Sequence, residues 1–257
     1  MVGRAAAVLE NGRVLAFAAL AAAVGAYYAW SDSLPNVSLW WDVAFLALVL
    51  IPAVFALVYL ALPLRRTRGL LLLGLAFGLV TWAFIGANLD ALANFSKLAA
   101  TTALAFWFVT YFDTAGLVVF VAALVPLVDA YSVWRGPTGN IVEHHPQVFT
   151  NVSFAFPVPG EHDAARLGPP DLLFFAFFLA AAAQFGLRVR LTAVCLALSF
   201  GATIAIATWA ESSGLPALPG LSLGFVLPNA DLLWRQLRAA RRSSRSAPRD
   251  PGREPGP

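Results

Sequence analysis

The chain has 257 residues, with 17 lysines and arginines against 14 aspartates and glutamates, which gives a formal net charge of +3. Hydrophobic residues make up 60% of the chain and charged residues only 12%. The apolar runs are longer than the core helices of a soluble domain require, so the composition excludes an ordinary soluble protein. Because the runs lack period-two alternation, they predict an all-α polytopic membrane protein and not a β-barrel.

Eight stretches approach the roughly 20 apolar residues that a membrane-spanning helix needs. In chain order they cover about residues 14–30, 40–63, 70–89, 97–112, 115–134, 170–187, 190–210 and 216–234. The pattern therefore predicts about eight transmembrane helices.

These stretches divide the chain into three parts. About four helices fall within residues 1–112, and a second group of helices occupies residues 113–234. The second group contains the only long hydrophilic loop, residues 135–167. Residues 235–257 are rich in Arg, Ser, Pro and Gly, which predicts a disordered basic tail.

The placement of basic residues predicts the orientation in the membrane. With eight spans, 14 of the 17 lysines and arginines lie on one side, and Lys97, Arg135 and Arg166 lie on the other. The positive-inside rule makes the crowded side cytoplasmic, so we expect both termini inside and the loop 135–167 outside. Arginine far outnumbers lysine and alanine is abundant, which is typical of a high-GC genome and indicates a bacterial plasma membrane.

Two aspartates stand out because ionisable residues at membrane depth are costly and indicate function. Asp129 follows the apolar run Leu124–Val128 and lies five residues before Trp134, roughly 7 Å below the outer end of its helix. Asp171 lies in the first turn of the next span, directly after Pro169 and Pro170. Consecutive antiparallel spans thus offer two carboxylates at similar depth.

An aspartic protease requires two facing carboxylates, because such a pair holds one proton and can serve as both acid and base. Such chemistry needs no metal or cofactor. Each residue also has an ordinary alternative. Asp171 is a typical first-turn acid stabilised by the helix dipole. Asp129 is placed to pair with Arg135 or Arg166, or to relay protons in a transporter.

Three motifs accompany these aspartates in a fixed order. Asp129 precedes Trp134-Arg135-Gly136-Pro137, Asp171 ends Gly168-Pro169-Pro170-Asp171, and the last span opens with Pro216-Ala217-Leu218-Pro219. Over about residues 115–234 this set resembles the presenilin and signal peptide peptidase family, the GxGD-type intramembrane aspartyl proteases. The chain departs from the family at Val128, where the family has tyrosine, and at Pro170, where it has glycine.

The resemblance implies a presenilin-like helical bundle in which Asp129 and Asp171 are catalytic. It also implies supporting roles for the motif residues Gly168, Pro170, Pro216, Ala217, Leu218 and Pro219. The expected substrates are transmembrane segments of membrane proteins or remnant signal peptides, with no nucleic acid involved. The orientation is similar to that of signal peptide peptidases. A non-catalytic pseudoprotease and a small-solute transporter that uses Asp129 as a proton relay remain alternatives.

The loop contains two groups of metal-ligand residue types, Glu143-His144-His145 and Glu161-His162-Asp163. Adjacent histidines in a loop are usually solvated, so we predict no metal site there.

Overall fold

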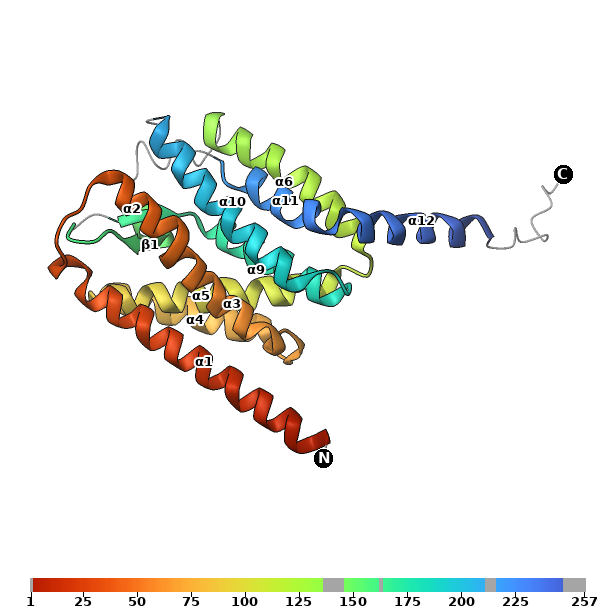
Figure 1. The fold of residues 1–257 in the computed structure, drawn as a ribbon, viewed down its shortest axis with the longest axis horizontal. Helices are drawn as coiled ribbons and strands as arrows, with labels where there is room; N and C mark the ends of the chain where they lie inside the picture. The colour runs from red at the N-terminus through yellow and green to blue at the C-terminus, as the bar shows by residue number, and fades with distance from the viewer. Residues whose placement is uncertain (1, 136–145, 162–163, 211–215, 247–257) are drawn as a thin grey trace.

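The computed structural model describes residues 2–135, 146–161, 164–210 and 216–246, and most of them are helical (Figure 1). The N-terminal half comprises α1 (Val2–Trp30), η1 (Ser31–Ser33), α2 (Leu39–Phe45), η2 (Leu46–Leu50), α3 (Ile51–Ala61), η3 (Leu62–Arg66), α4 (Leu70–Gly86), α5 (Asp90–Phe108) and η4 (Val109–Tyr111). The C-terminal half comprises α6 (Ala115–Arg135), α8 (Pro146–Val152), β1 (Phe154–Pro157), β2 (Ala164–Leu167), α9 (Pro169–Gln184), α10 (Val189–Trp209), α11 (Leu218–Val226), η5 (Leu227–Asn229) and α12 (Ala230–Ser246).

Within these described residues, five helical segments are long and apolar enough to cross a membrane. They are Asn11–Ser33, Leu39–Arg66, Asp90–Tyr111, Ala115–Ser132 and Val189–Trp209. Two further apolar helices are shorter, since α4 has 17 residues and α9 has 16. The helical architecture with apolar, membrane-length helices that the composition predicts is therefore present, whereas the described residues do not confirm eight spans.

The last predicted span, residues 216–234, is not one regular helix. Its apolar part is α11, which has only nine residues and ends at Val226. The 3₁₀ turn η5, which contains Pro228, separates it from α12. Helix α12 continues to Ser246, into residues 235–257, for which the sequence predicts a disordered tail. Leucine, alanine and arginine favour helix formation in this segment.

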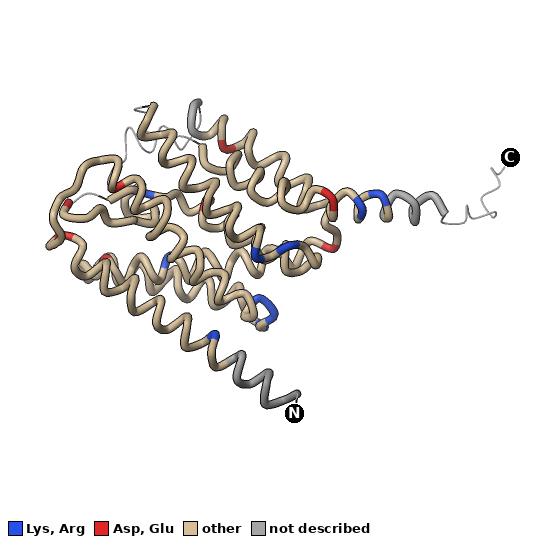
Figure 2. The backbone as a smooth tube through the Cα atoms, in the orientation of Figure 1, with Lys and Arg blue, Asp and Glu red and all other residues tan. Residues whose placement is uncertain are grey.

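The two ends of the bundle differ in composition. The large exposed tryptophans are Trp30, Trp40, Trp41, Trp82 and Trp209 at one end, and Trp234 on α12. The first five occur where α1, α4 and α10 finish and where α2 starts, and such aromatic belts are typical of a membrane interface. At the opposite end lie Arg13, Arg65, Arg66, Arg68, Arg188 and Arg190, where Figure 2 shows most of the basic residues gathered. We call these the tryptophan-rich end and the arginine-rich end.

A β-hairpin lies within the loop predicted for residues 135–167 and covers part of the tryptophan-rich end. Strands β1 and β2 pair antiparallel, with Phe154 opposite Leu167. Phe154 and Phe156 are buried. Since β2 leads directly into α9 through Gly168, the hairpin fixes where that helix begins.

Side chains from α1 and α5 hold this hairpin through its backbone. The contacts are Tyr27 Oη to Pro157 O at 2.7 Å, Tyr28 Oη to Ala155 O at 2.6 Å, Lys97 Nζ to Ser153 O at 2.8 Å, and Ala155 N to Asn94 Oδ1 at 3.1 Å. The hairpin is therefore part of the packed molecule.

Helix α9 is the most deeply buried helix of the bundle. Residues 175–182 have no exposed surface, and the helix contacts α3, α5, α6, α10 and α11. Aromatic rings fix it on two sides, since Phe175 stacks on Phe55 at 3.7 Å and Phe178 stacks on Phe225 at 4.9 Å between ring centroids. Packing along residues 175–182 therefore fixes the helix whose first turn carries Asp171.

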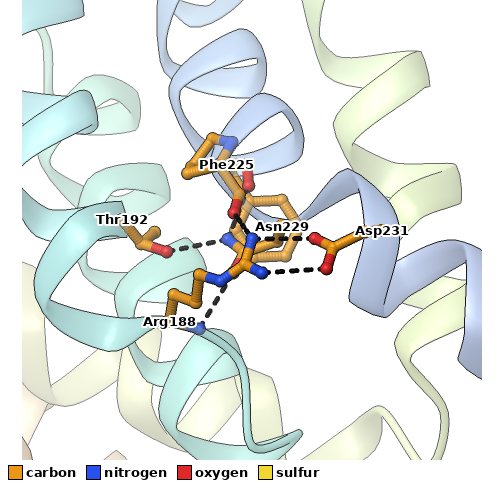
Figure 3. Close-up of polar contacts among 6 residues, drawn as sticks. Arg188, Thr192, Phe225, Asn229 and Asp231 are labelled. Atoms are coloured by element: carbon orange, nitrogen blue, oxygen red, sulfur yellow. Dashed lines mark hydrogen bonds and ion pairs between the residues drawn. The ribbon is translucent and has the colours of Figure 1, made fainter.

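A polar cluster at the arginine-rich end locks the junction of α11 and α12 to the start of α10 (Figure 3). Arg188 donates to both carboxylate oxygens of Asp231, at 2.7 and 2.8 Å, and its backbone N–H donates to Asn229 Oδ1 at 2.9 Å. Asn229 Nδ2 donates to Thr192 Oγ1 and to the carbonyl of Phe225, both at 2.8 Å. We call Arg188, Thr192, Asn229 and Asp231 the inner clamp. It fixes the C-terminal end of α11.

Candidate active site

Asp129 binds the start of α11. Its Oδ2 accepts a hydrogen bond from the backbone N–H of Leu218 at 3.0 Å. Leu218 is the first residue of α11, and first-turn N–H groups have no partner within their own helix. The positive end of the helix dipole also favours a carboxylate there. The contact joins two segments that are 89 residues apart in the sequence.

Asp171 is the third residue of α9 and lies against Gly168, which precedes the helix. The Asp171 backbone N–H donates to Gly168 O at 3.1 Å, and the Asp171 carboxylate accepts a hydrogen bond from the Gly168 amide. A Cβ atom at position 168 would lie 3.2 Å from Asp171 Oδ2. Glycine at this position therefore leaves room for the carboxylate to fold back on the helix start.

The two aspartates lie on helices that contact each other, and the Asp129 carboxylate acts electrostatically on Asp171. Both residues are partly exposed, so water can reach them. Helix α11 packs against both α6 and α9. The arrangement thus combines two carboxylates with the amide of Leu218, and no other charged side chain is recorded as bonded to either aspartate in the described parts of the chain.

The Pro-Ala-Leu-Pro motif forms the start of α11. Pro216 lies outside the helix, and Pro219 lies in the first turn, where its missing N–H would be unpaired in any case. Ala217 and Leu218 are 7% and 4% exposed, so they face protein and not lipid. Behind them, a Cβ at Gly224 would lie 3.0 Å from the carbonyl oxygen of Cys195, so glycine allows α11 to approach α10 closely.

Pro170 stands where the presenilin and signal peptide peptidase family has glycine. Like Pro219, it lies in a first helical turn, where a missing N–H costs no hydrogen bond. Pro169 and Pro170 are the first two residues of α9, where no intrahelical N–H bond is lost. The substitution therefore leaves the start of α9 and the position of Asp171 in the helix intact.

The sequence offered Arg135 and Arg166 as alternative partners of Asp129, and the structure describes the side chain of Arg166 but not that of Arg135. Arg166 donates to the carbonyl of Thr150 at 3.3 Å. The side chain of Arg135 lies outside the described residues, as do Glu143, His144 and His145 of the loop, and His162 and Asp163. In the parts of the chain that the structure describes, no three metal-ligating residues cluster together.

Several structural features had not been predicted. Lys97, the single lysine in an apolar stretch, could have been recognised as a half-buried anchor, and the alternation of Ser153-Phe154-Ala155-Phe156 before Pro159-Gly160 is typical of a hairpin. Ser222, one turn along α11 from Leu218, is buried, and its hydroxyl has no hydrogen-bond partner within the described structure.

Comparison of the chain with protein-family models, curated proteins and solved structures found no match. A functional assignment therefore depends on the residues of the site itself.

Proposed function

We propose that the chain is an intramembrane aspartyl protease that hydrolyses peptide bonds within or near transmembrane segments. The observation that carries this proposal is that Asp129 of α6 and Asp171 of α9 lie on helices in contact and act on each other electrostatically, while Asp129 accepts a hydrogen bond from the first amide of α11. The Pro-Ala-Leu-Pro motif supplies that amide, which supports the resemblance to the presenilin and signal peptide peptidase family.

The proposed mechanism uses one proton shared between the two carboxylates. The ionised aspartate takes a proton from a water molecule as that water attacks the scissile carbonyl, and the protonated aspartate donates a hydrogen bond to the carbonyl oxygen. The tetrahedral intermediate then collapses as a carboxyl proton moves to the departing amine. The Leu218 N–H holds Asp129 Oδ2 during the whole reaction, so the Asp129 carboxylate keeps one orientation toward Asp171.

The proposal extends to topology. The short helices α4 and α9 complete the membrane-embedded bundle, the arginine-rich end is cytoplasmic, and the hairpin lies outside, as in signal peptide peptidases. Helix α9 is about 24 Å long, shorter than a hydrocarbon core of about 30 Å, so its first turn is recessed below the outer membrane surface. Substrates are transmembrane segments or remnant signal peptides in a bacterial plasma membrane.

The test is an assay of the purified protein in lipid vesicles with a panel of single-span peptides inserted in both orientations. We expect cleavage near the outer end of the substrate span, with products identified by mass spectrometry. Asp129→Asn and Asp171→Asn should be inactive, whereas Asp90→Asn, an exposed aspartate at the start of α5, should cleave normally. Activity retained in either dyad variant would contradict the proposal.

One observation favours a second candidate, a presenilin-like pseudoprotease that binds membrane segments without cutting them. The hydrogen bond from the Gly168 amide to the Asp171 carboxylate is what an acid in the first helical turn makes for purely structural reasons. This candidate predicts that the peptides crosslink to the wild-type protein without being cleaved, and that binding survives in both dyad variants. Solute uptake that depends on Asp129 but not on Asp171 would instead indicate a transporter.

A further inference from the structure

A narrow apolar groove opens on the surface between α3 and α10, with a volume of about 330 Å³. Its floor is formed by the stacked rings of Phe55 and Phe175. Ala56 and Ala193 leave the walls open, because small side chains do not fill the space between the helices. The groove extends from Pro52 to Tyr59 along α3, which is about 10 Å of helix.

The groove ends in a polar group at the arginine-rich end. Arg190, in the first turn of α10, is exposed and is the one charged residue among the described residues that line the groove. Within the described residues it makes no recorded hydrogen bond or ion pair, whereas Arg13 donates to the carbonyls of Tyr59 and Leu60 and lies over the Tyr59 ring at 5.4 Å. The groove therefore combines an apolar lining with the exposed Arg190 guanidinium at one end.

We propose that this groove binds one acyl chain of an anionic phospholipid, with the lipid phosphate on Arg190. A guanidinium presents a fork of donors that matches a phosphate, and at a membrane interface the phosphate lies directly above the acyl chain. None of the described residues that line the groove is acidic, so none of them competes with a phosphate for the arginine. A transmembrane helix, about 10 to 12 Å across, is too wide for this volume, whereas a single hydrocarbon chain fits it.

The position of the groove gives the lipid a structural role that is independent of the proposed protease activity. Phe175, in its floor, lies one turn beyond Asp171 on α9 and stacks on Phe55 of α3 at 3.7 Å. Both rings are almost fully buried, so a bound chain packs on α3 and α10 in front of this stacked pair and braces α9 behind it. We therefore expect lipid binding to raise the thermal stability of the whole bundle.

The experiment measures lipid binding by native mass spectrometry and the midpoint of thermal unfolding in detergent. We expect phosphatidylglycerol to remain bound to the wild-type protein and raise the midpoint, and phosphatidylcholine or inorganic phosphate to do neither. Arg190→Gln should weaken phosphatidylglycerol binding about tenfold or more, because a charge-assisted hydrogen bond is lost. Ala193→Phe should remove binding by filling the groove while Arg190 is retained.

Arg68→Gln is the matched control, because Arg68 is an exposed arginine at the same end of the bundle but does not line the groove. It should bind phosphatidylglycerol as the wild type does. Equal loss in Arg68→Gln and Arg190→Gln would show that only general surface charge attracts the lipid. That result, or unchanged binding in Arg190→Gln, would overturn the proposal.

Discussion

The two ends of α11 are held by polar contacts of different character. At its C-terminal end, the inner clamp gives Asn229 three hydrogen bonds, and both Asn229 and Thr192 have no exposed surface. At its N-terminal end, Asp129 has one recorded hydrogen-bond donor, the amide of Leu218, and remains partly exposed beside Asp171. One end is closed and fully paired, whereas the other keeps free acceptor positions.

This difference separates a structural network from a chemical one. A buried network in which every group is paired rigidifies a fold, and a network that keeps free lone pairs within reach of water can bind and transfer protons. The inner clamp fixes α11 so that its first amide stays on Asp129. Substitutions at the clamp should therefore act on stability, and substitutions at the dyad should act on turnover.

The largest effect is expected at the dyad. Asp129→Ala and Asp171→Ala should each lower the rate of peptide cleavage by about 100- to 10,000-fold, because one carboxylate cannot serve as both acid and base. The midpoint of thermal unfolding should change little, since both residues are partly exposed. Cleavage assays and thermal unfolding of the same preparations measure the two effects. A large loss of stability in either variant would show that the aspartate concerned stabilises the fold and would contradict a purely chemical role.

The inner clamp should show the opposite behaviour. Asn229→Leu leaves the Arg188 amide and the Thr192 hydroxyl without their partner and should lower the free energy of unfolding by about 2 to 4 kcal/mol. Denaturant titration measures this change, and Asn151→Leu, at an exposed asparagine, serves as the control. Unchanged stability in Asn229→Leu would mean that the clamp does not hold α11.

Gly168→Ala tests whether the space beside the Asp171 carboxylate matters for turnover. The new Cβ would lie 3.2 Å from Asp171 Oδ2 and displace the carboxylate by a few tenths of an ångström, so we expect about a tenfold loss in cleavage rate. The backbone at 168 is extended, at φ −63° and ψ 147°, so alanine adds no strain. Gly78→Ala is the matched control, because a Cβ there meets nothing within 4 Å. An equal rate in both variants would show that the space at Gly168 does not matter for turnover.

The smallest effect concerns the exposed ion pair of the clamp. The hydrogen bonds from Arg188 lower the pKa of Asp231 below its ordinary value. The folded form therefore gains stability from this carboxylate above the unfolded-state pKa of about 3.9, and loses it as the pH falls through the lower folded-state pKa. Asp231→Asn should reduce stability slightly at pH 7 and weaken its acid dependence below about pH 4. Thermal unfolding across this range measures the difference, and identical curves for the two proteins would contradict it.

The sequence predicted the helical membrane class well, because long apolar runs leave few alternatives. It failed at residues 216–234, where hydropathy extends across Pro228 and Asn229 although the helix is interrupted there. It also missed the hairpin, because four-residue strands such as Phe154–Pro157 carry a weak alternation signal. Helix length and hairpin packing depend on tertiary contacts, among them those of Tyr28 and Lys97.

The candidate site was predictable in part. Hydropathy and topology placed Asp129 and Asp171 at the same end of consecutive helices, and the structure brings their helices into contact. The role of Leu218 N–H was not predictable, because a backbone amide carries no sequence signal. The clamp residue Asn229 was likewise missed, since its three partners come from distant or backbone positions.

The central claim is that Asp129 and Asp171 act as one chemical unit, and a double-mutant cycle on cleavage tests it most directly. Rates should be measured for the wild type, Asp129→Ala, Asp171→Ala and the double variant with one model transmembrane substrate. If the two carboxylates share one proton and one water, the double variant should be no slower than either single variant, as for residues that act together. Rate losses that multiply in the double variant would show that the two aspartates act independently and would contradict the account.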